Sequence, residues 1–422
     1  MTTWNDISDG NNKVCVHAWR GAYITPGGEV LPCCLTAAHK GTKEKFKKTS
    51  LSEFSLEDIR NNDKWNQLRK DLLEGIENPA CEFCWKNERQ GLKSKRHFYN
   101  QTYNNILNDI TFNLDGTLDN NNIAYWDVRG SNLCNMKCIM CDAGQSSLWN
   151  EEALKHKDNP DYNFVSYGDK AVFYANDRSL EPLESIMERH IDKAEQFYFA
   201  GGEPLISSIH WRILEMLVER KMFHVKLTYN SNLLKLQYGK YNALKMWENF
   251  DEVYICASLD AVGSRAEYSR AGTVWSTVDK NFREIMQQRP TQTGLCPTLS
   301  ILTIGGMNEL LDWADDCNVN PMKINLDNIL IGPKWLNPDI LPNQTRQEYW
   351  KKFEHQAKKC SNWQVMERRL QADINEHTHL VLGRTVQESR LEFKKQITSL
   401  DKVRNTNILE KCPDLKEFWQ SI

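Results

Sequence analysis

Ser131-Asn-Leu-Cys134-Asn-Met-Lys-Cys138-Ile-Met-Cys141-Asp142 is the stretch of sequence that decides the fold of this chain. Its three cysteines are spaced C-x3-C-x2-C and directly follow a β-rich run. Three thiolates at this spacing can bind one face of a cubane iron–sulfur cluster and leave the fourth iron without a protein ligand. A zinc site would normally have a fourth Cys or His close by, and none follows within this loop. The spacing therefore favours a cluster with one open iron over zinc or structural cysteines.

Short β-rich runs recur around and after this loop, with helical patterns between them. We expect barrel strands at 123–129, 196–199, 225–229, 252–259, 298–304 and 323–329. Strands that alternate with helices indicate parallel βαβ units. Six such units predict an α/β fold, a partial (β/α)6 barrel of the TIM type. We expect three domains: a cysteine-rich module with its linker at 1–120, the barrel at 121–340 and a charged helical extension at 341–422.

Composition narrows the class of protein. Of the 422 residues, 40% are hydrophobic and 26% charged, and the formal net charge of -3 gives no sign of a nucleic-acid partner. The N-terminus lacks a signal-peptide pattern and no run of about 18 apolar residues occurs, so we expect a cytoplasmic protein without membrane contact. Thirteen cysteines in a reducing compartment favour metal binding or catalysis over a disulfide framework.

A second group of cysteines lies in the N-terminal module. Cys15 and Cys33 flank a Pro-Gly-Gly turn that would join two short strands and bring the two thiols together. Cys81 and Cys84 supply a second pair, so four thiolates could hold a cluster. Cys34 is an alternative to Cys33 as a ligand. A four-cysteine zinc site is an alternative to the cluster, since paired cysteines suit both metals.

Strand parity selects further candidates. In the predicted strand 252–259, Cys256 shares a face with Ser258, because side chains two residues apart point the same way. Cys256 is therefore either a core thiol of the barrel or a hydrogen-atom donor to a substrate radical. Asp127 and Arg129 lie on the strand face opposite Trp126. In the barrel lumen they would form an ion pair or bind substrate.

The central loop resembles the signature of the radical S-adenosylmethionine (SAM) superfamily, a C-x3-C-x2-C loop after the first barrel strand. The resemblance covers most of residues 123–335 and implies a [4Fe–4S] cluster on Cys134, Cys138 and Cys141 whose open iron binds SAM. In that family, an electron from the cluster splits SAM into methionine and a 5'-deoxyadenosyl radical, which abstracts hydrogen from the substrate. Met140 stands where the family usually has an aromatic residue beside the adenine.

Other motifs follow the triad in the order that the family shows. They are a GGEP turn after a strand, two asparagines at a strand end, a Ser-x-Asp pair, an arginine that suits a carboxylate, and a weak match to the adenine-flanking motif. The resemblance implies SAM contacts at Gly201, Gly202, Glu203, Pro204, Asn230, Asn232, Ser258, Asp260, Arg270 and Ile304.

The N-terminal cysteines resemble the SPASM and twitch modules of radical SAM enzymes, including a G-x4-C element from Gly28 to Cys33. Gln90 and Ser94 stand where a full SPASM module would continue with cysteines. The shortened twitch form is therefore the better fit. It implies one auxiliary [4Fe–4S] cluster, with the ligands Cys15, Cys33, Cys81 and Cys84. Such modules usually follow the barrel, whereas this one precedes it.

The resemblance implies an oxidoreductase or modifying enzyme that abstracts hydrogen from a peptide or protein side chain and receives electrons from a flavodoxin- or ferredoxin-type donor. Two other functions are open. One is a dehydrogenase or epimerase that acts on a small molecule such as a sugar or nucleotide. The other is a non-catalytic iron–sulfur or zinc protein that serves as a scaffold.

Overall fold

The computed structural model describes residues 13–38, 49–162, 181–376, 378–381 and 383–422. The chain forms two compact units that alternate along the sequence. The first unit comprises Met1–Ser131, Asn176–Thr228 and Glu248–Glu252, and the second comprises Asn132–Ala175, Tyr229–Trp247 and Val253–Ile422. The three domains expected from the sequence stay a prediction.

The sheet of the first unit has the strand order β5-β3-β1-β2. β3 (Tyr125–Val128) lies parallel to β5 (Gln196–Phe199) on one side and to β1 (Gly21–Ile24) on the other. β2 (Val30–Leu31) pairs antiparallel with β1 across a turn in which Gly28 has a φ of 74°. The predicted N-terminal hairpin is therefore confirmed. Its parallel pairing with the first barrel strand was not predicted.

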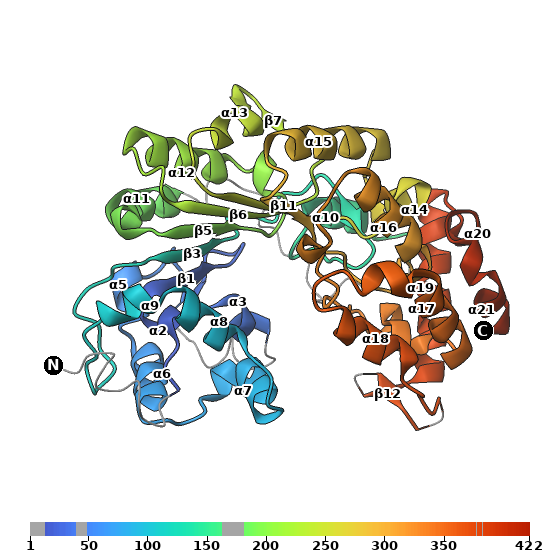
Figure 1. The fold of residues 1–422 in the computed structure, drawn as a ribbon, viewed down its shortest axis with the longest axis horizontal. Coiled ribbons are helices and arrows are strands. Elements are labelled where there is room, and N and C mark those ends of the chain that lie inside the picture. The colour runs from blue at the N-terminus through green and yellow to red at the C-terminus, as the bar shows by residue number, and fades with distance from the viewer. Residues whose placement is uncertain (1–12, 39–48, 163–180, 377, 382) are drawn as a thin grey trace. The chain divides into compact units, whose positions relative to one another are not determined.

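Helices cover both faces of this sheet (Figure 1). α11 and α12 lie on one face, and the helices of the N-terminal segment lie on the other. The helices of the first unit are α2 (Val16–Arg20), α3 (Cys34–Ala38), α5 (Leu56–Arg60), α6 (Asp63–Leu73), α7 (Glu82–Arg89), α8 (Lys95–Thr102), α9 (Asn104–Asn108), α11 (Glu181–His190) and α12 (Ser208–Glu219).

The two faces of the sheet carry different side chains. The ring of Trp126 stacks on that of Phe197, and Phe199 meets His210 of α12 edge to face, with ring centroids 4.7 Å apart. On the other face, the Tyr125 hydroxyl lies 3.2 Å from that of Tyr99 in α8. Trp126 thus faces the covering helices, as strand parity predicted. Asp127, one residue on, faces the opposite way.

In the second unit, β9 (Val253–Ala257) and β11 (Thr293–Leu295) are parallel. Two short strands, β4 (Lys137–Cys138) and β10 (Arg270–Ala271), form an antiparallel pair. The helices up to residue 316 are α10 (Ser147–Lys155), α13 (Ala243–Trp247), α14 (Gly263–Ser269), α15 (Trp275–Gln288) and α16 (Met307–Asp316). β6 (Lys226–Ser231) begins in the first unit, where Lys226 N–H donates to Glu195 O, and ends in the second, where its Ser231 O accepts from Ser258 N–H.

The C-terminal segment is helical, as its charged amphipathic pattern predicted. Its elements are α17 (Asn343–Ala357), α18 (Trp363–Gln371), the hairpin strands β12 (Leu380–Val381) and β13 (Arg384–Thr385), α19 (Val386–Arg404), α20 (Ile408–Lys411) and α21 (Lys416–Ser421). Thr385 and Glu388 form a capping box at the start of α19. None of the helices in the described ranges is both long and apolar enough to cross a membrane.

Two predicted barrel strands are wrong. In the segment 298–304, the Thr303 hydroxyl accepts from Ser300 N–H and donates to Thr298 O, and such local side-chain bonds compete with strand pairing. The segment 323–329 makes isolated bridges instead of a strand. The fifth strand is β11 instead. Its Gly294 lets the backbone of Lys323 approach so closely that an added Cβ would lie 2.2 Å from the Lys323 oxygen. The α/β class itself is as predicted.

Candidate functional site

Four cysteines of the first unit are electrostatic neighbours. Cys15 precedes α2, Cys33 follows β2, Cys81 ends the 3-10 turn Pro79–Cys81, and Cys84 lies in α7. All four are free thiols. Burial raises the pKa of Cys15, and the thiols of Cys33 and Cys84 raise it further. Burial, Cys33 and Cys15 likewise raise the pKa of Cys81. The hairpin and the Cys-x2-Cys pair thus bring together the set that the sequence proposed as ligands.

The Cys34 side chain lies near a different group of residues. Its sulfur lies 3.8 Å from the Lys95 ammonium, and Asp127 is also near it. Burial raises the pKa of Cys34 to about 11. Cys33, by contrast, lies 3.5 Å from the Thr36 hydroxyl and interacts with Cys84. The geometry therefore favours Cys33 over Cys34 as the fourth ligand.

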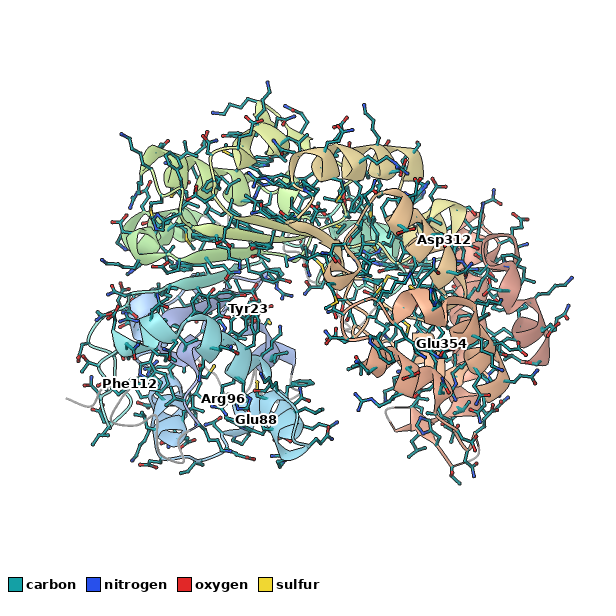
Figure 2. All side chains as sticks on the ribbon, viewed as in Figure 1. Tyr23, Glu88, Arg96, Phe112, Asp312 and Glu354 are labelled. Carbon is teal, nitrogen blue, oxygen red and sulfur yellow. A yellow bond between two sulfur atoms is a disulfide. The ribbon has the colours of Figure 1, made fainter. Side chains whose placement is uncertain are left out.

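A half-buried ion pair fixes the helices around these cysteines. The Arg96 guanidinium donates from Nε and Nη2 to the Glu88 carboxylate, at 3.0 and 2.8 Å (Figure 2). Its Nη1 donates to Val14 O at 3.1 Å, and it lies over the ring of Trp85. Because Val14 precedes Cys15 and Trp85 follows Cys84, this one arginine ties the two ligand-bearing segments together.

The central cysteines lie in the second unit. Cys138 belongs to β4 and pairs with Arg270 of β10. Cys141 N–H donates to Cys138 O at 3.0 Å, and Cys134 N–H donates to the Ser147 hydroxyl at 3.3 Å. None of the three cysteines forms a disulfide, and burial raises the pKa of both Cys138 and Cys141. The loop is therefore held by its backbone, with the thiols available as ligands.

Arg270 and Asp260 form a buried ion pair beside the central cysteines. Arg270 donates from Nε and Nη2 to the two Asp260 oxygens, at 2.6 and 2.9 Å, and its Nη1 lies 3.7 Å from the Cys138 sulfur. Asp260 also accepts from Thr298 N–H at 2.7 Å. Burial would lower the pKa of Arg270, but Asp260 and Cys138 raise it overall. A permanent cation is therefore fixed next to the thiol of one proposed ligand, Cys138.

A second contact reaches the loop from β6. Asn232 donates to the Asn135 side-chain oxygen at 2.7 Å. Gly272, with a φ of 108°, packs so closely that an added Cβ would lie 2.7 Å from Asn135 O. Asn232, Asp260 and Arg270 thus meet the cysteine loop. The other expected contacts of this unit are less informative: Met140, Asn230 and Ser258 are half-buried, and Ile304 is buried in the core.

The GGEP turn belongs to the first unit. Gly201 and Gly202 have φ values of 74° and 56°, a region that favours glycine. A Cβ on Gly201 would lie 2.7 Å from the Arg129 Cβ. Glu203 accepts from Leu205 N–H and caps the 3-10 turn Pro204–Ile206. The turn thus packs on Arg129.

Arg129 and Asp127 are an ion pair on the face of β3 that points away from α12. Arg129 Nε lies 3.3 Å from Asp127 Oδ1, and its guanidinium lies over the ring of Tyr23. Asp127 is 2% exposed, and burial raises its pKa although Arg129 opposes the shift. The sequence left open an ion pair or a substrate contact, and the ion pair is present.

The comparisons bear directly on the N-terminal cysteines. Residues 15–85 match the family model SPASM, described as an iron-sulfur cluster-binding domain. This segment is a SPASM iron–sulfur module. The matched range begins at the first of the four proposed ligands and includes the other three. The predicted N-terminal iron–sulfur module is therefore confirmed, while its place as a separate domain before the barrel stays a prediction.

Solved structures offer distant likenesses, and no curated protein matches the chain. Native anSMEcpe with bound AdoMet has 16% identity and a TM-score of 0.38, over 56% of this chain and 63% of that one. Streptococcus suis SuiB bound to S-adenosylmethionine has 14% and 0.35, over 70% and 62%. TYW1 with a lysine-pyruvate adduct has 13% and 0.31, over 57% and 72%. The match spans less than two thirds of the anSMEcpe and SuiB chains.

The donor atoms suit clusters at both cysteine sets. Within the described ranges, no three Cys, His, Asp or Glu side chains stand where they could share one metal ion. A cubane binds each thiolate at a different iron, so its ligands need not converge on one metal ion. Four cysteines of the SPASM module and three of the central loop, none of them in a disulfide, match the donor sets of a complete and an open [4Fe–4S] cluster.

Cys256 is not the free thiol that the sequence predicted. It forms a disulfide with Cys296, with the Cα atoms 5.9 Å apart. β9 lies beside β11, and Cys296 directly follows β11, so the two residues are neighbours across the strands. The shared face was inferred correctly, since Cys256 and Ser258 are both half-buried between fully buried neighbours.

Three residues that support the central loop were missed. Asn135 lies inside the cysteine motif, but only the cysteines and Met140 of that motif were predicted to have a role. Trp149 donates from its indole N–H to Cys138 O at 2.9 Å, and Arg404 donates to Lys137 O at 3.3 Å. Of the residues around the loop, Gly272 alone carries a sequence signal, since a glycine two residues after Arg270 indicates a close backbone approach such as the one to Asn135. Nothing in the sequence pointed to Arg404.

Proposed function

We propose that this chain is a radical SAM enzyme whose central loop holds a [4Fe–4S] cluster on Cys134, Cys138 and Cys141. The supporting observation is the Asp260–Arg270 ion pair beside the Cys138 sulfur. A buried cation next to a thiolate ligand offsets the negative charge that a thiolate-bound cluster carries. A scaffold protein would not require the further elements that suit SAM, which are the GGEP turn and an arginine placed to bind a carboxylate.

The cluster, when bound with SAM, supplies a 5'-deoxyadenosyl radical for hydrogen abstraction. The residues of the chain bind and orient. Arg270 could hold the methionine carboxylate, since a planar guanidinium suits a carboxylate. By the family resemblance, the GGEP turn is a proposed contact of the methionine amino group, and its glycines permit a close backbone approach. Asn230, Asn232 and Ser258 are proposed contacts of the nucleoside part, and Met140 can pack on the adenine.

The SPASM module supports a peptide or protein side chain as the substrate, because radical SAM enzymes with such modules mostly modify peptides. In this proposal the auxiliary cluster accepts an electron from the product radical or binds the substrate. A flavodoxin- or ferredoxin-type protein is the proposed electron donor. The reaction would be an oxidation or modification that begins with hydrogen abstraction.

One face of the first unit is suited to the substrate. Burial raises the pKa of the Asp127 carboxyl, and Arg129 and Lys95 both lower it, so two cations act on this face. The Cys34 thiol, half-buried and 3.8 Å from Lys95 Nζ, belongs to the same face. We propose that these residues contact an anionic part of the substrate, in keeping with the role suggested for Asp127 and Arg129 from the sequence.

Iron content and SAM cleavage test the assignment. After anaerobic reconstitution, the wild type should hold about eight irons and the triple variant Cys134→Ala, Cys138→Ala, Cys141→Ala about four, as two four-iron clusters require. With dithionite, only the wild type should release 5'-deoxyadenosine. Full iron without SAM cleavage in the wild type would leave the scaffold function in place of the enzyme.

Deuterium transfer tests the substrate class. The reconstituted enzyme is given SAM with either the peptide fraction or the small-molecule fraction of cells grown in deuterated medium. Hydrogen abstraction from the substrate would put deuterium into 5'-deoxyadenosine, which mass spectrometry detects. We expect the label from the peptide fraction. Label from the small-molecule fraction alone would replace the peptide proposal by the sugar or nucleotide alternative.

A further inference from the structure

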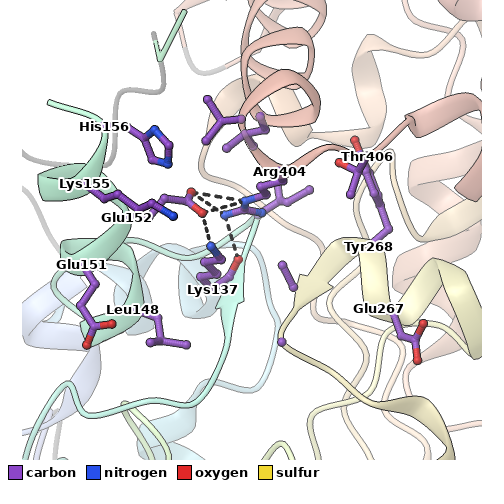
Figure 3. A pocket seen from close by; sticks show the side chains of 15 residues that line it. Lys137, Leu148, Glu151, Glu152, Lys155, His156, Glu267, Tyr268, Arg404 and Thr406 are labelled. Carbon is purple, nitrogen blue, oxygen red and sulfur yellow. Dashed lines mark hydrogen bonds and ion pairs between the residues drawn. The ribbon is translucent and has the colours of Figure 1, made fainter. Parts of the chain in front are cut away.

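The C-terminal helix α19 ends against the back of the cysteine loop. The guanidinium of Arg404, its last residue, donates to the Glu152 carboxylate of α10 from Nη2 at 3.0 Å and from Nε at 3.1 Å. The same Nη2 donates to Lys137 O at 3.3 Å, and Lys137 is itself ion-paired with Glu152. Figure 3 shows the three side chains joined in this network.

Arg404 and Glu152 are the buried members of this network, and the side chain of Lys137 is 30% exposed. The side chains of Arg404 and Glu152 are 8% and 3% exposed. Burial alone would raise the pKa of Glu152, but Arg404 and Lys137 hold it below its usual value. Each charge therefore depends on its partner, because an unpaired buried charge is strongly destabilising.

A second path runs from Arg404 to the next residue of the loop. Its guanidinium carbon lies 4.6 Å from the centroid of the Trp149 ring, a cation–π contact. Trp149 is fully buried and donates to Cys138 O at 2.9 Å. Arg404 thus fixes the carbonyls of two consecutive residues, Lys137 directly and Cys138 through Trp149.

We propose that Arg404 is a positioning residue for the catalytic cluster: it holds the backbone at Lys137 and Cys138 so that the three cysteines keep the orientation in which they bind iron. This assignment rests on the proposed function of the loop. It gives a C-terminal helix a role in the active site, because Arg404 of α19 contacts the loop although it lies more than 250 residues further along the chain.

If the Arg404 head group were removed, neighbouring side chains would not pack against the loop in its place. A cavity of about 430 Å³ adjoins the network, lined by Ile139 of the loop, by α10 and α14, and by Leu400 and Val403 of α19. Side chains around a cavity leave room for a freed loop to move. Removal of the Arg404 head group should therefore loosen the loop instead of being absorbed by its neighbours.

The same helix offers a matched control in Arg390. Its Nη1 pairs with Glu376 at 2.6 Å, its Nε donates to Ile340 O at 2.7 Å, and its guanidinium lies over the ring of Phe418. Arg390 thus has a carboxylate, a carbonyl and an aromatic ring, as Arg404 has, but none of them belongs to the cysteine loop. Arg404→Met and Arg390→Met should cost similar stability.

Hydrogen exchange on the metal-free chain gives the first readout. The amides of Ile139 and Cys141 donate to Ser269 O and Cys138 O and report on opening of the loop. We expect these amides to exchange at least about tenfold faster in Arg404→Met, as for the loss of a hydrogen bond to a charged group, and at the wild-type rate in Arg390→Met. Equal rates in the two variants would overturn the proposal.

The reconstituted enzyme gives the second readout. In Arg404→Met, the reduction potential of the central cluster and its electron paramagnetic resonance spectrum with SAM should differ from the wild type, while Arg390→Met leaves both unchanged. Arg404→Lys, which keeps the charge without the planar fork, should fall between them and serves if the Met variant does not fold. A wild type that does not cleave SAM would end the proposed function, whereas the exchange experiment would still decide the role of Arg404.

Discussion

Asp260→Asn isolates the contribution of the ion pair beside the central cysteines. The substitution keeps the shape of the side chain and its acceptor for Thr298 N–H but removes the negative charge. Arg270 is then left as a cation that is 14% exposed and 3.7 Å from the Cys138 sulfur. Removing one partner of a buried pair typically costs 3–5 kcal/mol. Because Arg270 keeps some contact with solvent, we expect about 3 kcal/mol.

A double-mutant cycle on the metal-free chain measures this value without interference from the clusters. Urea unfolding, followed by tryptophan fluorescence, gives the free energy of unfolding of the wild type, Asp260→Asn, Arg270→Met and the double variant. The double variant should be less destabilised than the sum of the single variants, by about 2 kcal/mol, because it leaves no unpaired charge.

An exposed pair in the same unit serves as the control. Asp316 pairs with Arg283 at 2.7 Å, with side chains 68% and 40% exposed. Asp316→Asn should change the free energy of unfolding by less than about 1 kcal/mol, as exposed pairs do. If Asp260→Asn costs no more than this control, or if the cycle is additive, the ion pair is not the constraint that we describe.

Three further outcomes are expected. Cys33→Ala should lose about four of eight irons and Cys34→Ala none; iron loss from Cys34→Ala instead would reverse the ligand assignment. In the reconstituted enzyme, Lys95→Met should lower the ratio of iodoacetate to iodoacetamide alkylation rates at Cys34 about fivefold, because a nearby cation is lost. The control Lys93→Met should leave this ratio unchanged. An unchanged ratio in both variants would count against an anion site. Burial lowers the pKa of His210 to about 3, so the folded state resists protonation of this side chain. Its contribution to the free energy of unfolding is complete above the unfolded pKa near 6.5. That free energy falls by up to about 1.4 kcal/mol per pH unit as the pH drops from there towards 3. His210→Leu should flatten that decline in urea unfolding, and an unaltered slope would refute the assignment to His210.

The sequence predicted those strands whose residues carry a clear periodic pattern. β3, β5, β6 and β9 lie within or overlap their predicted ranges. The segment 298–304 has strand-forming residues too, yet the Thr303 hydroxyl bonds to its own backbone, which no propensity reveals. β11 was missed because Gly294 and the following Cys-Pro read as a turn.

The candidate site was predictable as a set of residue types and much less as a set of contacts. The cysteine spacing identified the loop, and Asp260 and Arg270 were each expected at SAM. Their pairing with one another depends on how α14 brings Arg270 back towards Asp260, which local patterns do not contain. The disulfide of Cys256 depends in the same way on strand adjacency.

The composition of the central loop explains why residues far along the chain must support it. Three of the eight residues from Cys134 to Cys141 are cysteines reserved for iron, so few side chains remain to fold the loop on itself. Several of its described backbone contacts accordingly come from other elements, among them Arg270 of β10, Trp149 of α10 and Arg404 of α19. A loop held in this way loosens when a distant contact fails. Variants that impair cluster binding should therefore occur in the C-terminal helices as well as in the cysteine motif.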